Sequence, residues 1–255
     1  MSSSFKVVIP ARFESSRLPG KVLLQVGDKP MVQHVWERAG ASGAAEVVIA
    51  TDNEQVATVS RGFGADVCMT GTDCQSGTDR VAEVSATRGW SDGDIVVNVQ
   101  GDAPLLPPAS IGTVAGLLDA NPDASVATLC TPLRTEGEYG DPNVVKVVAD
   151  SAGRALYFSR AAIPAAGHGF VAADALPLAH RHLGLYAYRV AALRTLSAAP
   201  PCALEQLERL EQLRAMWLGM EIRVAVDETA HGPDVDTAED LAKVAALLAA
   251  GADHG

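Results

Sequence analysis

The chain has 255 residues, of which 48% are hydrophobic, so it is long enough for one large α/β domain or two smaller ones. Its formal net charge of −11 argues against binding to nucleic acid or to an anionic membrane, because the long-range field repels both. No apolar run approaches the ~20 residues of a membrane-spanning helix, and no signal region precedes the first predicted strand. We therefore expect a cytoplasmic protein. The four cysteines form no C-x-x-C pair, which predicts reduced, buried thiols.

Residues 7–21 combine a buried strand with a basic loop. The apolar run 7–9 breaks at Pro10 into a loop that carries Arg12, Arg17 and Lys21 and only one acid, Glu14. In an open parallel sheet, ligands bind at the carboxyl ends of the strands, where strand order reverses. Arg and Lys there suit phosphate oxygens, so the loop is predicted to hold a polyphosphate, although a solvated basic turn is the simpler alternative. The loop is not a Walker A motif.

The next segments alternate between helix and strand. We predict helices over residues 30–39, 54–61, 81–86 and 107–118, and strands over 46–50, 66–69, 94–100 and 125–129. This alternation is typical of parallel βαβ units. The polar cluster 75–80 precedes one helix, and there Ser76 or Thr78 either caps the helix or receives the polar groups of a nucleotide.

A carboxylate follows the strand that begins at Asp94. This strand runs out at Gly101, whose missing side chain allows close backbone approach, and it presents Asp102 at the carboxyl end of the sheet. Asp236, near the start of the last predicted helix, is a second candidate carboxylate, although simple helix capping also accounts for it. Hard oxygen ligands of this kind suit Mg²⁺ when phosphates supply further oxygens.

The second half of the chain changes pattern. Residues 144–148 and 154–159 are predicted to form an antiparallel hairpin, residues 161–179 a mobile loop, and residues 180–189 and 222–226 two more strands. Residues 204–216 are predicted to form one helix whose acids mostly face solvent. A final helix is expected to run to about residue 250.

Eight motifs follow one another along the chain: V-I-P-A-R-F-x-S-S-R-L-P-G-K (8–21), A-T-D (50–52), Q-S-G-T-D-R (75–80), N-V-Q-G-D (98–102), Y-F-S-R (157–160), R-H-L-G-L-Y-A-Y-R (181–189), L-E-Q-L-R (210–214) and V-D-T-x-E-D-L (235–241). In content and order they resemble the 3-deoxy-manno-octulosonate cytidylyltransferase (CMP-KDO synthetase) family. The resemblance implies transfer of CMP from CTP to the anomeric hydroxyl of KDO, with release of pyrophosphate, feeding lipopolysaccharide biosynthesis.

The resemblance also implies roles for individual residues. Those implied to be catalytic are Arg17, Lys21, Asp102 and Asp236, with Asp102 and Asp236 as the Mg²⁺ ligands. Those implied to bind the nucleotide are Arg12, Lys21, Ser76, Thr78 and Arg80. Those implied to surround the sugar acid are Gln100, Arg160, His182, Tyr186, Glu211 and Gln212.

The expected fold is a three-layer α/β sandwich of Rossmann-like nucleotidyltransferase type, mainly parallel, with a small antiparallel β lobe. We expect one domain over residues 1–255, with the lobe at about 141–200 contributing to sugar binding and to the contact of a homodimer. The strand over residues 181–189 is assigned to that lobe.

Three departures from the family pattern leave the acceptor open. Ala103 stands where a Glu is common, Ala165 where a Trp is common, and Asp234 where a glycine is usual. One alternative is therefore a cytidylyltransferase for another acidic acceptor. Another is a catalytically silent nucleotide-binding protein, against which the presence of Arg17, Lys21 and both aspartates argues. A Rossmann dehydrogenase is disfavoured, because no G-x-G-x-x-G follows the first strand.

Overall fold

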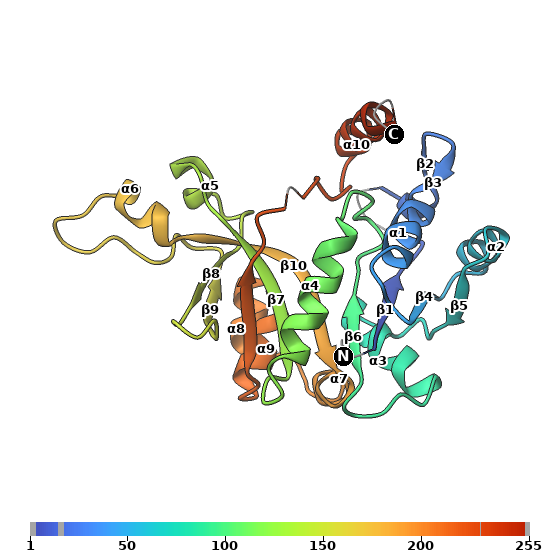
Figure 1. Cartoon of the computed structure of the whole chain (residues 1–255), viewed down its shortest axis with the longest axis horizontal. Helices are drawn as coiled ribbons and strands as arrows, with labels where there is room; N and C mark the ends of the chain where they lie inside the picture. Colours follow the sequence, from blue (N-terminus) through green and yellow to red (C-terminus); the bar gives the residue numbers. More distant parts are fainter. Residues whose placement is uncertain (1–3, 15–17, 230, 253–255) are drawn as a thin grey trace.

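The computed structural model describes residues 4–14, 18–229 and 231–252, and it shows a central sheet between two layers of helices (Figure 1). Within these residues nine strands form the sheet, seven of them in the order β11-β7-β10-β6-β1-β4-β5, with β8 and β9 attached along β10. The strands on the path are β11 (Ile222–Val226), β7 (Val126–Pro132), β10 (His180–Arg189), β6 (Ile95–Asn98), β1 (Phe5–Pro10), β4 (Glu46–Thr51) and β5 (Asp66–Met69). The predicted α/β class with a mainly parallel sheet is confirmed.

Alternation of apolar side chains along the strands explains the two helical layers. In β1, Val7 and Ile9 belong to one hydrophobic cluster and Val8 to the other, because successive side chains leave a strand on opposite faces. Both clusters are fully buried at these positions. The first face is covered by α1 (Met31–Gly40), α2 (Glu54–Gly62) and α4 (Pro108–Asp119), and the second by α3 (Gly77–Thr87) and α7 (Val190–Ala198).

Strand order reverses at β1. This strand pairs in parallel with β4 on one side and with β6 on the other, so the chain changes direction across the sheet between them. A crevice forms at the carboxyl ends of strands at such a point. Gly101 follows the end of β6 by three residues, and a Cβ there would stand 2.8 Å from the Pro10 carbonyl oxygen. The two strand ends therefore approach as closely as the sequence predicted.

Strand β10 differs from its prediction. Only its beginning, at His180 and Arg181, pairs with β8 (Lys146–Ala149) of the hairpin. From Tyr186 onward it lies between β6 and β7 and runs antiparallel to both. Most of this strand therefore belongs to the central sheet rather than to a separate lobe, and it brings Tyr186 opposite Asn98.

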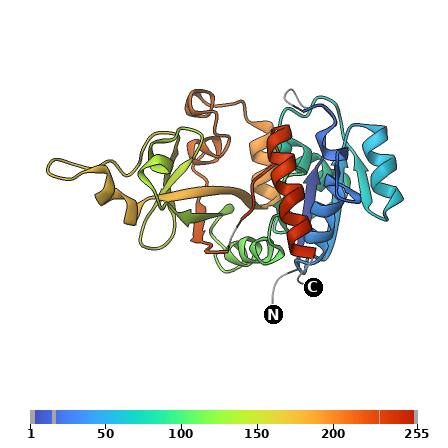
Figure 2. The same ribbon diagram turned by 90° about the horizontal axis from the view of Figure 1, so that it is seen from above.

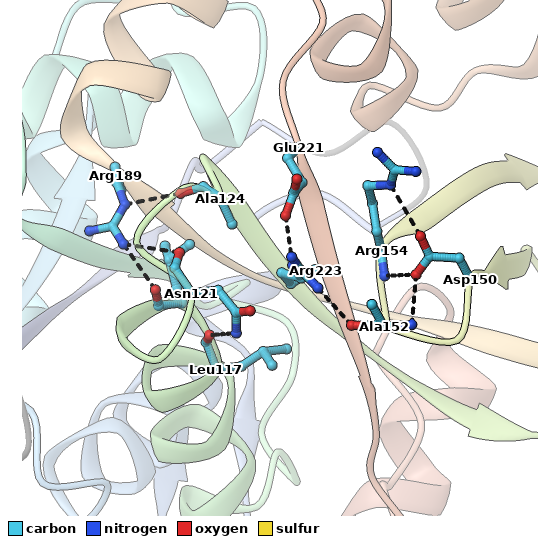
Figure 3. A network of polar contacts seen from close by, with 10 residues as sticks. Leu117, Asn121, Ala124, Asp150, Ala152, Arg154, Arg189, Glu221 and Arg223 are labelled. Atoms are coloured by element: carbon cyan, nitrogen blue, oxygen red, sulfur yellow. Dashed lines mark hydrogen bonds and ion pairs between the residues drawn. The ribbon is translucent and has the colours of Figure 1, made fainter.

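The predicted hairpin of β8 and β9 (Ala155–Ser159) is confirmed, and its turn is anchored to β11 (Figure 3). Asp150 Oδ1 accepts hydrogen bonds from the amides of Ala152 and Arg154, each at 2.9 Å. Arg223 of β11 donates to the Ala152 carbonyl oxygen at 2.6 Å and to Glu221 at 2.6 Å. These bonds attach the hairpin turn to the edge of the sheet.

A second anchor closes the end of the sheet opposite the crevice. Arg189, the last residue of β10, donates to the carbonyl oxygens of Ala124 at 3.0 Å and Asn121 at 3.3 Å (Figure 3). Asn121 in turn donates to the Leu117 carbonyl oxygen of α4 at 2.8 Å. Arg189 also donates to the carbonyl oxygen of Leu118, in the last turn of α4, at 3.0 Å, so the guanidinium holds the end of α4 and the turn after it against β10.

The prediction of one helix over residues 204–216 is wrong. The chain forms α8 (Ala203–Glu208) and α9 (Gln212–Trp217), and between them Arg209 adopts a left-handed conformation with φ of 52°. The acids do not form a solvated face either. Glu205 pairs with Arg214 at 2.7 Å, and Glu208 accepts a hydrogen bond from Ser159 at 2.7 Å. The leucines of residues 204–216 have the spacing of a single helix, which is why one helix was predicted. The bonds of Glu205 and Glu208 to other elements instead favour two helices with a break at Arg209.

Several short elements were not predicted. They are η1 (Lys21–Leu23), β2 (Gln25–Val26), β3 (Lys29–Pro30), α5 (Glu136–Gly140), α6 (Ala172–Ala175) and η2 (Leu176–Leu178). The last two lie in the segment 161–179, which projects away from the sheet in both overall views (Figures 1 and 2). The final helix, α10 (Ala238–Ala252), packs near β2. None of the described helices is long and apolar enough to cross a membrane, and all four cysteines are free thiols.

Candidate functional site

A cavity of about 300 Å³ opens at the carboxyl ends of β1 and β6, where strand order reverses. Seven of the candidate site residues line it: Arg12, Lys21, Ser76, Arg80, Gln100, Asp102 and Asp236. They come from four separate parts of the chain. The sheet brings them together because the loops after β1 and β6 leave it at the same edge.

Lys21 occupies the centre of this cavity wall. Its ammonium bonds to Asp102 Oδ2, to Asp236 Oδ1 at 3.2 Å and to the Val235 carbonyl oxygen at 3.2 Å. Burial acts to lower the pKa of Lys21, but the two carboxylates outweigh it and raise that pKa. Lys21 therefore carries a fixed positive charge where the two predicted metal carboxylates meet.

The amino-terminal end of α3 forms a second wall. Ser76 is the N-cap, as one of the two interpretations predicted: its Oγ accepts from the Asp79 amide at 3.1 Å, and the Asp79 carboxylate accepts from the Ser76 amide at 3.0 Å. Gly77 packs close to Gln100, with 3.4 Å between its ideal Cβ position and Gln100 Nε2. Backbone N–H groups at such a helix end favour an anion.

Arg80 is almost fully buried below the cavity. Its guanidinium donates to Asp52 at 2.8 Å and to the Thr70 hydroxyl. It thereby ties the A-T-D turn after β4 to α3. This ion pair holds the A-T-D motif against the Q-S-G-T-D-R motif, whose Ser76, Thr78 and Arg80 the family resemblance assigns to the nucleotide.

Buried polar groups lie next to α3 without enough partners. Glu211 bonds to the hydroxyls of Ser76 and Thr78; burial raises its pKa and these bonds act in the opposite direction. Asn98 Oδ1 and the Tyr186 hydroxyl are buried and have no hydrogen-bond partner among the described residues. Leaving such groups unpaired costs about 1–3 kcal/mol each, so they mark a place that a polar ligand or water would complete.

A second cavity, of about 290 Å³, adjoins the first and shares Gln100 with it. Its lining includes Asn98, Gln100, Asn143, Arg181, His182 and Asp234. It lies between the β8–β10 region and the segment that leads from β11 to α10. The shared glutamine makes the two cavities adjacent compartments of one site.

His182 is neutral in this second cavity. Burial lowers its pKa to about 3. Its Nε2 lies 2.9 Å from the Thr128 hydroxyl, which itself donates to the Leu185 carbonyl oxygen at 2.7 Å. The hydroxyl proton is thus engaged, so Nε2 carries the imidazole proton and donates to Thr128. A residue held this way positions or orients rather than accepting a proton near neutral pH.

Asp234 adds a third carboxylate beside Lys21. Asp234 is exposed, and it lines the second cavity. Partial removal from water in this cavity and the negative charges of Asp102 and Asp236 raise the pKa of Asp234 to about 6, whereas Arg181 acts to lower it. The sequence noted this residue only as a departure from a family glycine. Its position between the two cavities could not be read from spacing.

The donor set fits a hard divalent cation. Asp102 and Asp236 both pair with Lys21, and their negative charges add to the effect of burial in raising the pKa of Asp234. No group of three or more His, Cys, Asp or Glu side chains suited to a metal occurs in the part of the chain that the structure describes. Two carboxylates with phosphate and water oxygens complete the coordination that Mg²⁺ prefers.

Other predicted residues lie elsewhere. Arg17 is outside the described residues. Arg160 donates to the carbonyl oxygens of Glu208 at 2.7 Å and Pro142 at 2.9 Å, and neither Arg160 nor Gln212 lines the two cavities. Sequence reasoning missed Asn143 as a lining residue, and Asn98 stood inside a quoted motif without an assigned role.

The family model described as cytidylyltransferase matches residues 6–222. The 3-deoxy-manno-octulosonate cytidylyltransferase of Thioalkalivibrio sulfidiphilus (strain HL-EbGR7) is 54% identical over 250 residues, 97% of this chain and 100% of the relative. The protein of the same name from Haemophilus ducreyi (strain 35000HP / ATCC 700724) is 50% identical over 248 residues, 96% of this chain and 98% of its own.

Solved structures agree with this. A CMP:2-keto-3-deoxy-manno-octonic acid synthetase complexed with CTP superposes with a TM-score of 0.90 and 43% identity, covering 98% of this chain and 100% of that one. A cytidylyltransferase from Leptospira borgpetersenii serovar Hardjo-bovis (strain JB197) shares the fold, with a TM-score of 0.64 and 16% identity over 97% of this chain and 88% of its own.

Proposed function

Because the chain belongs to the cytidylyltransferase family and is a nucleotidyltransferase, we propose that it transfers CMP from CTP to the anomeric hydroxyl of KDO, giving CMP-KDO and pyrophosphate. The observation that carries the proposal is the position of Lys21 between Asp102 and Asp236, at the reversal of strand order. A relative with this fold has been solved in complex with CTP.

The first cavity takes CTP. Arg12 and Lys21 face the triphosphate, Ser76 and the amino-terminal end of α3 receive polar groups of the nucleotide, and Thr78 lies beneath that helix end. Arg80 acts through its ion pair with Asp52, which fixes the shape of the nucleoside pocket. Arg17 is assigned to the triphosphate by the family motif alone.

The second cavity takes the sugar acid. Gln100 lines both compartments and therefore lies where the two substrates meet. His182 lines the same cavity, and the unpaired Tyr186 hydroxyl lies near Glu211. We include Arg160 and Gln212 on the strength of the family motif; they line neither cavity, so their contact with the acid requires the end of β9 and the start of α9 to move.

The reaction is a direct in-line displacement. The anomeric oxygen of KDO forms a bond to the α-phosphorus, the bond from that phosphorus to the β-phosphate oxygen breaks, the hydroxyl proton is released and pyrophosphate leaves. Catalysis of this kind depends mainly on positioning and charge neutralisation, so no protein nucleophile is required. Lys21 and Arg17 offset the charge that grows on the leaving pyrophosphate.

Asp102 and Asp236 hold Mg²⁺ in this proposal. The bound ion supplies neutralisation of triphosphate charge. Lys21 then has a second task, because its ammonium keeps two mutually repelling carboxylates side by side before the ion arrives.

The test is pyrophosphate release from CTP and Mg²⁺ with and without KDO, with CMP-KDO identified by mass. We expect release that depends on KDO. Release with a different sugar acid but not with KDO would show that KDO is not the acceptor, while the proposed transfer of CMP from CTP would still hold. Tight CTP binding without turnover on any acid would replace the proposal by the silent binder.

We further propose a cytoplasmic homodimer. Large apolar side chains are exposed on the β8–β9 side of the molecule: Leu156 is 50% exposed, Leu207 82% and Trp217 63%. A second copy covering them would bury this surface. Light scattering of Trp217→Lys is expected to give a monomer, and an unchanged dimer would place the contact elsewhere.

A further inference from the structure

The segment 227–237 connects β11 to α10 and carries two of the three carboxylates near Lys21. Two backbone bonds attach it to the sheet: the Asp227 amide donates to the Cys130 carbonyl oxygen at 2.8 Å, and the Val235 amide donates to the Asp102 carbonyl oxygen at 2.9 Å. The path of this segment therefore determines how far Asp236 lies from Asp102.

Three side chains from distant parts of the chain meet at the start of this segment. Ser110 of α4 donates to Asp227 Oδ2 at 2.5 Å, and His231 Nε2 lies 3.1 Å from both that carboxylate oxygen and the Ser110 hydroxyl. Ser110 is 1% exposed, and the side chains of Asp227 and His231 are 8% and 15% exposed. Burial acts to raise the pKa of Asp227, but hydrogen bonds from Ser110, Thr229 and His231 outweigh it and hold that pKa below its ordinary value.

The next residue makes the close approach possible. A Cβ on Gly232 would stand 2.5 Å from Leu105 Cβ, so a side chain at this position would push the segment away from the turn before α4. Leu105 follows Asp102 by three residues. The segment therefore lies directly against the turn that carries the other carboxylate.

A serine, a histidine and an aspartate together suggest a hydrolytic triad, but the geometry excludes it. In such a triad the carboxylate and the serine use different imidazole nitrogens. Here both contacts are made by Nε2, and the serine proton already goes to Asp227. The cluster can hold its members in place but cannot activate Ser110 as a nucleophile.

We propose that Ser110, Asp227 and His231 form a latch that holds residues 227–229 and 231–236 against α4 and so sets the position of Asp234 and Asp236 relative to Asp102 and Lys21. Ser110 and Asp227 are positioning residues that act through Asp236, and His231 does the same while also lining the second cavity. The kinetic consequence rests on the proposed function, because it concerns the divalent cation that Asp102 and Asp236 would hold. The structural consequence does not.

The structural consequence is tested by hydrogen exchange on the full chain. Ser110→Ala and His231→Ala are expected to raise the exchange rates of amides in the peptide spanning residues 227–237 by about tenfold or more, and to leave β1 and β4 unchanged. Ser85→Ala is the matched control, because Ser85 is also a buried helical serine but bonds only within its own helix, to the Ala82 carbonyl oxygen at 2.7 Å. Unchanged exchange in the latch variants would overturn the proposal.

The kinetic consequence separates positioning from general destabilisation. In His231→Ala the Mg²⁺ concentration for half-maximal pyrophosphate release is expected to rise about tenfold, as for other residues that orient metal ligands, while the KM for CTP stays within about twofold. His231→Gln, which keeps a donor near the Nε2 position, should recover most of the loss. Equal changes in the Mg²⁺ concentration for half-maximal release and in the KM for CTP, or no recovery in His231→Gln, would show that Ser110, Asp227 and His231 have a merely structural role.

The hydrogen-exchange test and the kinetic test can each fail without the other. If the unaltered chain releases no pyrophosphate with any acid, the proposed function is wrong, and hydrogen exchange still decides whether the latch holds the segment. The double variant Ser110→Ala/His231→Ala sharpens this, because members of one unit give a smaller combined effect than the sum of the single effects. Additive effects on exchange would contradict a single latch.

Discussion

Lys146 and Lys21 are both largely removed from water, but their ammonium groups have different kinds of partner. Lys146, on β8, is fully buried, and its ammonium donates to three carbonyl oxygens: Asp141 at 2.9 Å, Val144 at 2.6 Å and Arg160 at 2.8 Å. All three protons are used. Burial lowers the pKa of Lys146, but the carbonyl cage supplies what water would have supplied.

Lys21 is instead surrounded by more opposite charge than it can neutralise. It faces Asp102 and Asp236, while Asp234 lies near them, and its side chain is 15% exposed in an open cavity. Nearby, Asn98 and Tyr186 keep buried polar atoms without partners among the described residues. A buried charged group whose hydrogen bonds are all made, such as Lys146, therefore indicates a structural role. Excess charge and unpaired buried polar atoms, as around Lys21, indicate a ligand-binding site.

The largest expected effect is the loss of kcat when one of the carboxylates around Lys21 is removed. Asp102→Asn should lower kcat by about 10²- to 10³-fold, because one carboxylate for the cation is lost from a site that works by charge placement. Asp150→Asn is the control, since that side chain accepts two backbone amides and pairs with Arg154 within the β8–β9 turn, and it lines neither cavity. Steady-state pyrophosphate release measures both. A kcat for Asp102→Asn within threefold of the unaltered chain would break the comparison.

The next effect concerns how closely the strands approach at the site. Gly101→Ala should destabilise the fold by about 1–3 kcal/mol, because its Cβ would stand 2.8 Å from a carbonyl oxygen that cannot move freely. Gly116→Ala, in α4 with no atom within 4 Å of the added Cβ, should stabilise it by up to about 1 kcal/mol. Urea unfolding compares the two. Equal effects would mean that the strand ends are loosely packed.

A smaller effect distinguishes an unpaired hydroxyl from a paired one. Tyr186→Phe should leave the free energy of unfolding unchanged or raise it, since the hydroxyl has no partner among the described residues, while the KM for the acid rises about tenfold. Tyr139→Phe should do the reverse: its hydroxyl donates to the Pro164 carbonyl oxygen at 2.6 Å, so unfolding free energy falls by about 1 kcal/mol. A stability loss in Tyr186→Phe would show that its hydroxyl serves the fold.

The smallest effect is a pH dependence of stability. The pKa of Asp227 is lowered in the folded state from an ordinary value of 3.8, so its carboxylate stabilises the fold above that pH and loses the contribution as pH falls below it. Between pH 5.5 and pH 3.5 the stability advantage over Asp227→Asn should shrink by about 1 kcal/mol. Urea unfolding at both pH values measures it. An advantage that grows on acidification would contradict the direction of the shift.

The sequence predicts the part of the site that strand ends create. The runs before Pro10 and Gly101 are recognisable as parallel strands, and the carboxyl ends of such strands meet, so Lys21 and Asp102 are expected together. The caps of α2 and α3 follow in the same way, because Asn53 and Ser76 act on amides two or three residues away. Local chemistry and sheet topology suffice for these features.

The remainder depends on contacts between distant residues. Nothing near Arg209 in the sequence shows that α8 must end there, since the break is stabilised by bonds from Glu205 and Glu208 to other elements. Ser110 and His231 are 121 residues apart, and no motif joins them. That the Tyr186 hydroxyl has no partner among the described residues is likewise a property of packing, which no local pattern encodes.

The most direct test of the central contrast compares Lys21→Met with Lys146→Met by thermal unfolding and by pyrophosphate release at a temperature where both are folded. Lys146→Met should lose about 2–4 kcal/mol, or about 5–10 °C in Tm, and keep kcat within about threefold, because it strips three carbonyls of their donor. Lys21→Met should lose about 10²- to 10³-fold in kcat and lower Tm by less than Lys146→Met does, since Asp102 and Asp236, which lose their partner, remain 23% and 43% exposed to water. A Lys21→Met variant that loses as much Tm as Lys146→Met, or that keeps its turnover, would contradict the account.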